Sequence, residues 1–115
     1  MPLLKLQTTT ALSAEKQQEL LASLSKIVTE SIGKPEQYVM VTLETGPIII
    51  SGKQGDAAFA DIRSIGGLNG NVNKQISQKL CTLLEQSLGI APERVYLNFT
   101  DVSAQNWGWR GNTFG

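Results

Sequence analysis

The 115-residue sequence contains no histidine and a single cysteine, Cys81. Without histidine the chain has no Cys/His zinc site, no Ser-His-Asp triad and no imidazole to carry a proton near neutral pH. One cysteine cannot form a disulfide within the chain. A proton-transfer enzyme with this sequence would therefore need a perturbed side chain, the thiol or the α-amino group at the chain terminus, because ordinary carboxylates titrate too low and lysines too high.

The sequence also lacks an excess of charge and any long apolar run. Ten basic residues balance ten acidic ones and only three are arginines, which argues against a nucleic-acid partner. No apolar run has transmembrane length, and residues 1–5 lack the features of a signal peptide. We therefore expect a protein of the cytoplasm with no membrane partner. The apolar fraction of 41% and the charged fraction of 17% are typical of one globular domain spanning residues 1–115.

In the first half of the chain, the hydrophobic pattern predicts a strand, a helix and a strand. Residues 3–8 read as a short strand. Apolar residues then recur at spacings of three and four between Ser13, a good N-cap, and Gly33, a typical C-cap. Alternation over residues 39–43 predicts the next strand, and the apolar run 48–50 predicts a further short one.

The same order recurs in the second half. Residues 59–65 read as a strand, residues 66–70 as a glycine-rich turn, and the apolar stripe from Val72 to Leu88 as a helix that Gly89 ends. The segment Pro92-Glu93 echoes Pro35-Glu36 at an offset of 57 residues. We interpret this as an internal repeat of a βαβ unit, over about residues 1–57 and 58–115.

Two βαβ units predict an α+β fold, a two-layer sandwich in which a four-stranded sheet carries two helices on one face. The last predicted strand indicates what lies on the sheet face that carries no helices. Val95, Leu97 and Phe99 alternate along it with substantial side chains that point to the opposite side. A sheet covered on one face only in a short chain predicts a second subunit on the other face, and hence a homo-oligomer.

The C-terminal segment, residues 105–115, holds both tryptophans and shows no strong helical or strand period. Large aromatic side chains on an irregular tail are a solubility liability unless they pack against something. Two interpretations are open: packing against a neighbouring subunit, which the pattern favours, or forming the wall of an apolar pocket.

Several short motifs, taken in order, carry a resemblance to a known family. They are Pro2 after the initiator Met, Gly33-Lys34-Pro35 with Gln37-Tyr38, Ser64-Ile65-Gly66, Arg94-Val95-Tyr96 with Asn98, and Gly108-Trp109 with Asn112-Thr113-Phe114. From residue 2 to the end, the chain resembles the macrophage migration inhibitory factor family of the tautomerase superfamily. The resemblance implies a homotrimer with active sites between subunits, in which each subunit has the fold predicted above.

The resemblance also implies a chemistry that needs no histidine and no cofactor or metal. In the family the initiator Met is lost, and the amine of Pro2 acts as the general base and acid in keto-enol tautomerisation of arylpyruvates such as phenylpyruvate. The amine must be neutral to accept a proton, so the site must lower its pKa by desolvation or by a nearby cation. Lys34 matches the family's cation, which would also hold the carboxylate of a small anionic aryl keto acid.

The other substrate-binding residues that the resemblance implies are Ile65, Tyr96, Asn98, Trp107, Trp109 and Phe114. The main chain of Ile65 lies beside a glycine-rich turn and would contact the carboxylate. Tyr96 and Asn98 share a strand face and resemble a pair that a neighbouring subunit lends to the pocket. The two tryptophans and Phe114 would be apolar walls, although the family often has a smaller aliphatic residue at the position of Trp107.

Other interpretations of the same residues stay open. Pro2 can be a processing or strand-start feature, Lys34 a cation at a helix C-terminus, and Tyr96 an ordinary interface tyrosine. The alternative function is a trimeric cytokine-like interaction factor with incidental tautomerase activity. However, a Cys-x-x-Cys that some members carry is absent at residues 57–60, and the sequence gives no support for a protein receptor.

The sequence also bears on other reactions of the same proline, on the place of Cys81 and on export. A decarboxylase or hydratase that uses the same proline would need extra charged residues, of which only Arg110 is a candidate. Cys81 lies beside the apolar stripe of the second helix and is expected in the core. Because family members can leave the cell without a signal peptide, export is a second option beside the cytoplasm.

Overall fold

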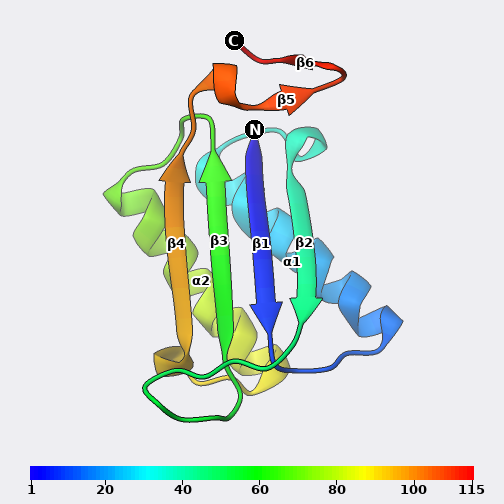
Figure 1. The fold of residues 1–115 in the computed structure, drawn as a ribbon, viewed down its shortest axis with the longest axis vertical. Coiled ribbons are helices and arrows are strands. Elements are labelled where there is room, and N and C mark those ends of the chain that lie inside the picture. Colours follow the sequence, from blue (N-terminus) through cyan, green and yellow to red (C-terminus); the bar gives the residue numbers. More distant parts are fainter.

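A computed structural model describes all residues, 1–115, as a two-layer arrangement of helices on a sheet (Figure 1). The elements in chain order are β1 (Pro2–Thr8), α1 (Ala14–Ile32), β2 (Met40–Thr45), β3 (Ala58–Ser64), α2 (Gly70–Leu88), β4 (Val95–Asp101), β5 (Gly108–Trp109) and β6 (Asn112–Thr113). Short 3₁₀ turns at Glu36–Tyr38, Pro92–Arg94 and Ala104–Asn106 connect them.

The main sheet has the strand order β2-β1-β3-β4. β1 is parallel to β2, β3 is parallel to β4, and the two central strands β1 and β3 are antiparallel. Each parallel pair is joined through a helix, so the chain contains two βαβ units side by side. Both helices lie on the same face of the sheet (Figure 1). The α+β fold, with four strands and two helices on one face, is thus confirmed.

Local capping sets the ends of both helices. The Ser13 hydroxyl accepts a hydrogen bond from the Lys16 amide at 3.3 Å, and the Asn69 side chain accepts one from the Val72 amide at 2.9 Å. These caps satisfy amide groups that have no partner within the helix. Both helices end at a glycine in the left-handed conformation, as the sequence predicted.

The core lies between the helices and the sheet. Fourteen buried apolar residues form it: Leu4, Leu6, Leu20, Leu24, Val28, Ile32, Ala58, Ala60, Ile62, Ile76, Leu80, Leu84, Ile90 and Val95. The opposite face of the sheet has no covering layer within the chain, and there Met40 is 61% exposed and Tyr96 65% exposed. These two large apolar side chains lie on the two edge strands, β2 and β4, of the uncovered face.

Three sequence predictions need correction. Residues 48–50 are not a strand: only Ile50 pairs, in a single bridge with Lys53, because the chain reverses at once and presents no strand edge. The C-terminal segment is more regular than expected, since β5 and β6 form a small antiparallel hairpin. Cys81 is half-buried and packs at the margin of the core. No helix of the structure has the length and apolarity to cross a membrane.

Candidate functional site

Pro2 lies at the start of β1, at the end of the sheet where the C-terminal hairpin crosses above the N-terminus (Figure 1). Its side chain is fully buried. In the sheet register Pro2 is opposite Ser64 of β3, which is in turn opposite Asp101 of β4. The three strands therefore bring the start of β1 beside the glycine-rich turn that follows β3.

That turn is tied down by three hydrogen bonds. The Ser64 hydroxyl donates to the Gly66 carbonyl at 2.7 Å, and the Gly66 amide donates to the Asp101 carboxylate at 3.0 Å. The Val102 amide donates to the Ser64 carbonyl at 2.9 Å. Because both neighbours of Ile65 are held, its main chain has a fixed place beside the start of β1. The amide of Gly66 itself already has a carboxylate partner.

Lys34 follows the C-terminal end of α1 and packs against the same turn. A Cβ atom on Gly67 would lie 2.6 Å from the Ile32 side chain and 3.6 Å from Cε of Lys34. The turn and the end of α1 are thus in direct contact, and only glycine fits between them. This contact fixes the stem of a half-buried lysine close to the N-terminus of the chain.

The environment at the start of β1 disfavours a charged amine. Burial, and secondly the positive charge of Lys34, lower the pKa of the Met1 terminal amine below its usual value. Both causes favour the neutral amine, which is the form that can accept a proton. The structure therefore brings together Pro2, Lys34 and the turn at Ile65.

An aromatic cluster lies above this end of the sheet. The rings of Tyr38 and Trp109 meet edge to face with centroids 6.1 Å apart, and Trp109 stacks on Phe114 at 5.5 Å. Trp109 and Phe114 were predicted as apolar walls, and the structure joins them in one cluster. The candidate residues chosen from the sequence omitted Tyr38, although it belongs to the Gln37-Tyr38 motif that carried the resemblance.

Trp107 lies nearby, against the uncovered face of the sheet. It lines a shallow cavity of about 270 Å³ together with Leu3, Arg63, Val102, Asn106 and Gly108. Leu3 follows Pro2 directly, so this cavity adjoins the start of β1. Trp107 thus lies near the start of β1. Its backbone carbonyl accepts a hydrogen bond from the Phe114 amide at 3.1 Å.

Tyr96 and Asn98 are not brought to Pro2 within one chain. Tyr96 is in register with Phe59, which is in register with Gln7. Gln7 is five residues along β1 from Pro2, which is about 17 Å at the usual strand rise. Both side chains are exposed on the uncovered sheet face. A site that includes Pro2 and Tyr96 therefore requires two copies of the chain.

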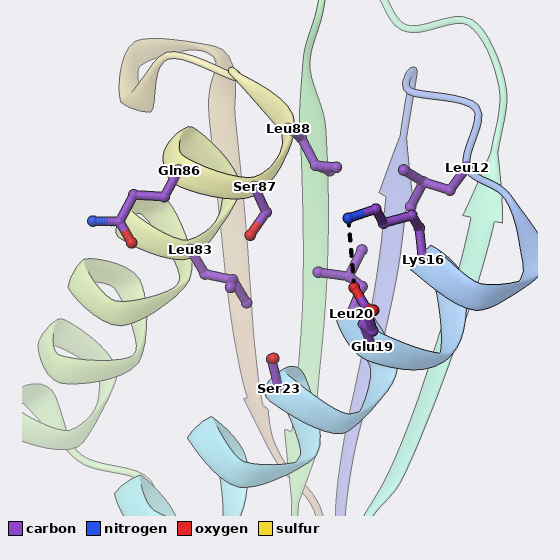
Figure 2. Close-up of a pocket in the computed structure, with 9 residues that line it drawn as sticks. All are labelled: Leu12, Lys16, Glu19, Leu20, Ser23, Leu83, Gln86, Ser87 and Leu88. Atoms are coloured by element: carbon purple, nitrogen blue, oxygen red, sulfur yellow. Dashed lines mark ion pairs between the residues drawn. The ribbon is translucent and has the colours of Figure 1, made fainter.

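A separate cavity of about 290 Å³ lies between the start of α1 and the end of α2 (Figure 2). These helix ends lie at the opposite end of the molecule from the N-terminus (Figure 1). Leu12, Leu20, Leu83 and Leu88 form its apolar part. Lys16 and Glu19 pair at its mouth at 3.7 Å, and both are largely exposed. It contains none of the residues predicted for the site.

Similarity to known proteins defines the class to which this protein belongs. The whole chain, residues 1–115, matches the family model "Macrophage migration inhibitory factor (MIF)". The protein belongs to the macrophage migration inhibitory factor family. It is 38% identical to macrophage migration inhibitory factor of Meriones unguiculatus over 96 residues, which cover 83% of this chain and 84% of the relative.

Solved structures agree with this assignment. The crystal structure of the macrophage migration inhibitory factor-like protein of Entamoeba histolytica matches with a TM-score of 0.94 and 36% identity, and covers 98% of both chains. A further match is the protein Pt0534, solved after inactivation by 2-oxo-3-pentynoate, with a TM-score of 0.84 and 25% identity over 96% of this chain and 93% of that one. The compound that inactivated Pt0534 is a keto acid.

Proposed function

We propose that the protein is a keto-enol tautomerase of arylpyruvates and that the amine of Pro2 is its general base and acid after removal of Met1. The observation that carries the proposal is the place of Pro2, which is buried at the start of β1 beside the turn that Lys34 contacts; burial and Lys34 also lower the pKa of the Met1 amine there. Removal of Met1 would move this amine one residue further along β1, to a residue that is fully buried. Burial and the charge of Lys34 would then act on the Pro2 nitrogen itself.

In the proposed mechanism, the neutral Pro2 nitrogen takes a proton from the carbon beside the keto group of the substrate. The electron pair of that C–H bond forms the enol double bond, and the carbonyl oxygen gains the negative charge. The protonated amine then returns the proton to that oxygen, so the same residue acts as base and acid. The ammonium of Lys34 and the main chain at Ile65 would hold the substrate carboxylate.

The active unit in this proposal is a homotrimer. The support is the strand register, which places Tyr96 level with Gln7 and Asn98 level with Lys5 on the uncovered sheet face, whereas Pro2 is buried with Leu4 and Leu6. The uncovered sheet face, with its exposed Met40 and Tyr96, is the surface that a second copy would cover. Tyr96, Asn98, Trp107, Trp109 and Phe114 would then enclose the aryl part of the substrate between subunits.

The deciding experiment measures enol-keto exchange of phenylpyruvate with the wild type, Pro2→Gly and Lys34→Ala. Lys26→Ala, which removes an exposed lysine from α1, is the matched control for loss of one positive charge. We expect Pro2→Gly to lose most of the activity, Lys34→Ala to raise KM and lower kcat, and Lys26→Ala to match the wild type. A wild type no faster than buffer, or an unaffected Pro2→Gly, contradicts the mechanism.

Two cheaper measurements bear on the same proposal. A mass spectrum must show loss of Met1, because a retained methionine would block the proline amine. The mass in solution at micromolar concentration must exceed that of one subunit. A stable trimer without any exchange activity would favour the alternative, in which the assembly is a cytokine-like interaction factor.

A further inference from the structure

Arg110 occupies an unusual backbone position next to the aromatic cluster. It forms, with Gly111, the two-residue turn between β5 and β6, and their φ angles are 53° and 76°. Two consecutive residues with positive φ are typical of a type I′ hairpin turn, which favours Asn-Gly because most side chains resist this conformation. An arginine here is disfavoured by the backbone, and such positions concentrate at functional sites.

The side chain of Arg110 has free hydrogen-bonding capacity. Its guanidinium lies over the Trp109 ring, 5.3 Å from the centroid, and it makes no hydrogen bond or ion pair within the chain. The other two arginines each have hydrogen-bond partners within the chain. Arg63 pairs with Asp61 through two nitrogens, and Arg94 donates to four backbone carbonyls.

The position of this cation matters because Trp109 belongs to the candidate site. Tyr38, Phe114 and Arg110 all contact the Trp109 ring. A ligand whose aryl ring binds against Trp109 would therefore lie beside the guanidinium, which is 5.3 Å from the centre of that ring. Lys34 supplies a separate cation beside the N-terminus of β1, so the site has one positive group for the keto acid and another beside the aromatic wall.

We propose that Arg110 is a specificity-determining residue and that the site prefers aryl keto acids with a second anionic group, such as a carboxylate, at the far end of the ring. The planar guanidinium matches a carboxylate with two parallel hydrogen bonds. Its place over Trp109 leaves those donors available. This inference rests on the proposed tautomerase function and names its substrate class more closely.

The test compares kcat/KM for phenylpyruvate and 4-carboxyphenylpyruvate. The variants are Arg110→Asn, which removes the guanidinium but suits the turn, and Arg110→Lys, which keeps the charge but not the fork. Lys79→Ala, an exposed lysine of α2, controls for the loss of one surface charge. A charge-assisted hydrogen bond predicts a preference for the dianion of about tenfold in the wild type and in Lys79→Ala.

We expect Arg110→Asn to abolish the preference for 4-carboxyphenylpyruvate over phenylpyruvate and Arg110→Lys to keep only part of it. Added salt should reduce this preference in the wild type but have no effect on the substrate ratio in Arg110→Asn. Thermal unfolding should show Arg110→Asn to be at least as stable as the wild type, which excludes misfolding as the cause. If phenylpyruvate is turned over but the substrate ratio is the same in the wild type and Arg110→Asn, this inference is wrong and the proposed function stands. If the wild type turns over neither keto acid, both fail.

Discussion

Replacement of Gly67 by alanine tests the contact that places Lys34. Gly67 has a φ of 82°, and a Cβ there would lie 2.6 Å from the Ile32 side chain and 3.4 Å from the Ile32 carbonyl oxygen. Ile32 is buried and β-branched, so its rotamer in the helix is stiff and cannot move aside. The adjacent Gly66 is the matched control, because its φ is 73° but nothing lies within 4 Å of its Cβ position.

The two substitutions share one cost and differ in the other. An alanine in the left-handed conformation costs about 1 to 2 kcal/mol at either position. The overlap with Ile32 adds about 1 to 3 kcal/mol at Gly67 only. We therefore expect Gly66→Ala to lower the free energy of unfolding by about 1 to 2 kcal/mol and Gly67→Ala by about 2 to 5 kcal/mol.

The assay is urea unfolding at one fixed protein concentration, since the stability of an oligomer depends on concentration. The slope m should stay constant, so that the shift in midpoint reports stability. Gly67→Ala should also raise KM for phenylpyruvate more than Gly66→Ala, because the overlap with Ile32 pushes on the end of α1, which Lys34 follows. Equal midpoints for the two variants would refute the close approach between the turn and α1.

Further predictions concern the loop, the helix ends, the amine and the thiol. Arg94→Ala should lower the free energy of unfolding by about 2 to 3 kcal/mol, because it removes the guanidinium that donates to four backbone carbonyls of residues 50–56. Arg94→Lys should recover only part of this loss. Protease cleavage within the loop is the measurement, and an uncut loop in Arg94→Ala would contradict the prediction. Asn69→Ala should cost about 1 kcal/mol through loss of the α2 cap, measured by thermal unfolding against Asn69→Asp, which keeps the acceptor. The activity should fall at low pH as the terminal amine becomes protonated. Lys34→Ala should move this acid limb of the pH–activity profile to higher pH, because Lys34 lowers the pKa of the amine. An acid limb that does not move would argue against an interaction between Lys34 and the amine. Burial, and secondly the charge of Glu85, raise the pKa of the Cys81 thiol. Its reaction with a disulfide reagent should therefore be slow at pH 8 and faster in Glu85→Gln. Equal rates in the wild type and Glu85→Gln would contradict the influence of Glu85.

The elements that the sequence predicted well are those whose signals are local. Both long helices carry an apolar stripe, and the structure places caps at the predicted Ser13, Gly33 and Gly89. The N-cap of α2, Asn69, lies in the segment that was predicted only as a turn. Alternation over β4 likewise corresponded to a buried face and an exposed face. Such patterns are visible in a window of a few residues, because the core face repeats every turn of a helix or every second residue of a strand.

The errors came where a partner distant in the chain decides the structure. Residues 48–50 are as apolar as a buried strand. However, Arg94, which lies more than forty residues later, donates a hydrogen bond to the Ile50 carbonyl at 3.1 Å and holds the segment as a loop. The hairpin of β5 and β6 was not predicted because strands of two residues show no periodicity. Tyr38 was not selected as a site residue because only the folded chain brings it to Trp109.

In the proposed mechanism, a chain without histidine carries out proton transfer through its terminal amine. The first residue of a chain is linked to the chain on one side only, so the fold must position its amine by placing that residue on a strand and surrounding it. Here β1 lies in the centre of the sheet, β3 beside it ends in a turn tied to Asp101, and α1 ends against that turn at Gly67. Burial at the start of β1 and the charge of Lys34, which follows α1, both lower the pKa of the Met1 amine. The same packing that fixes the position of the amine thus lowers its pKa, and this coupling makes the N-terminus the strongest candidate for the base.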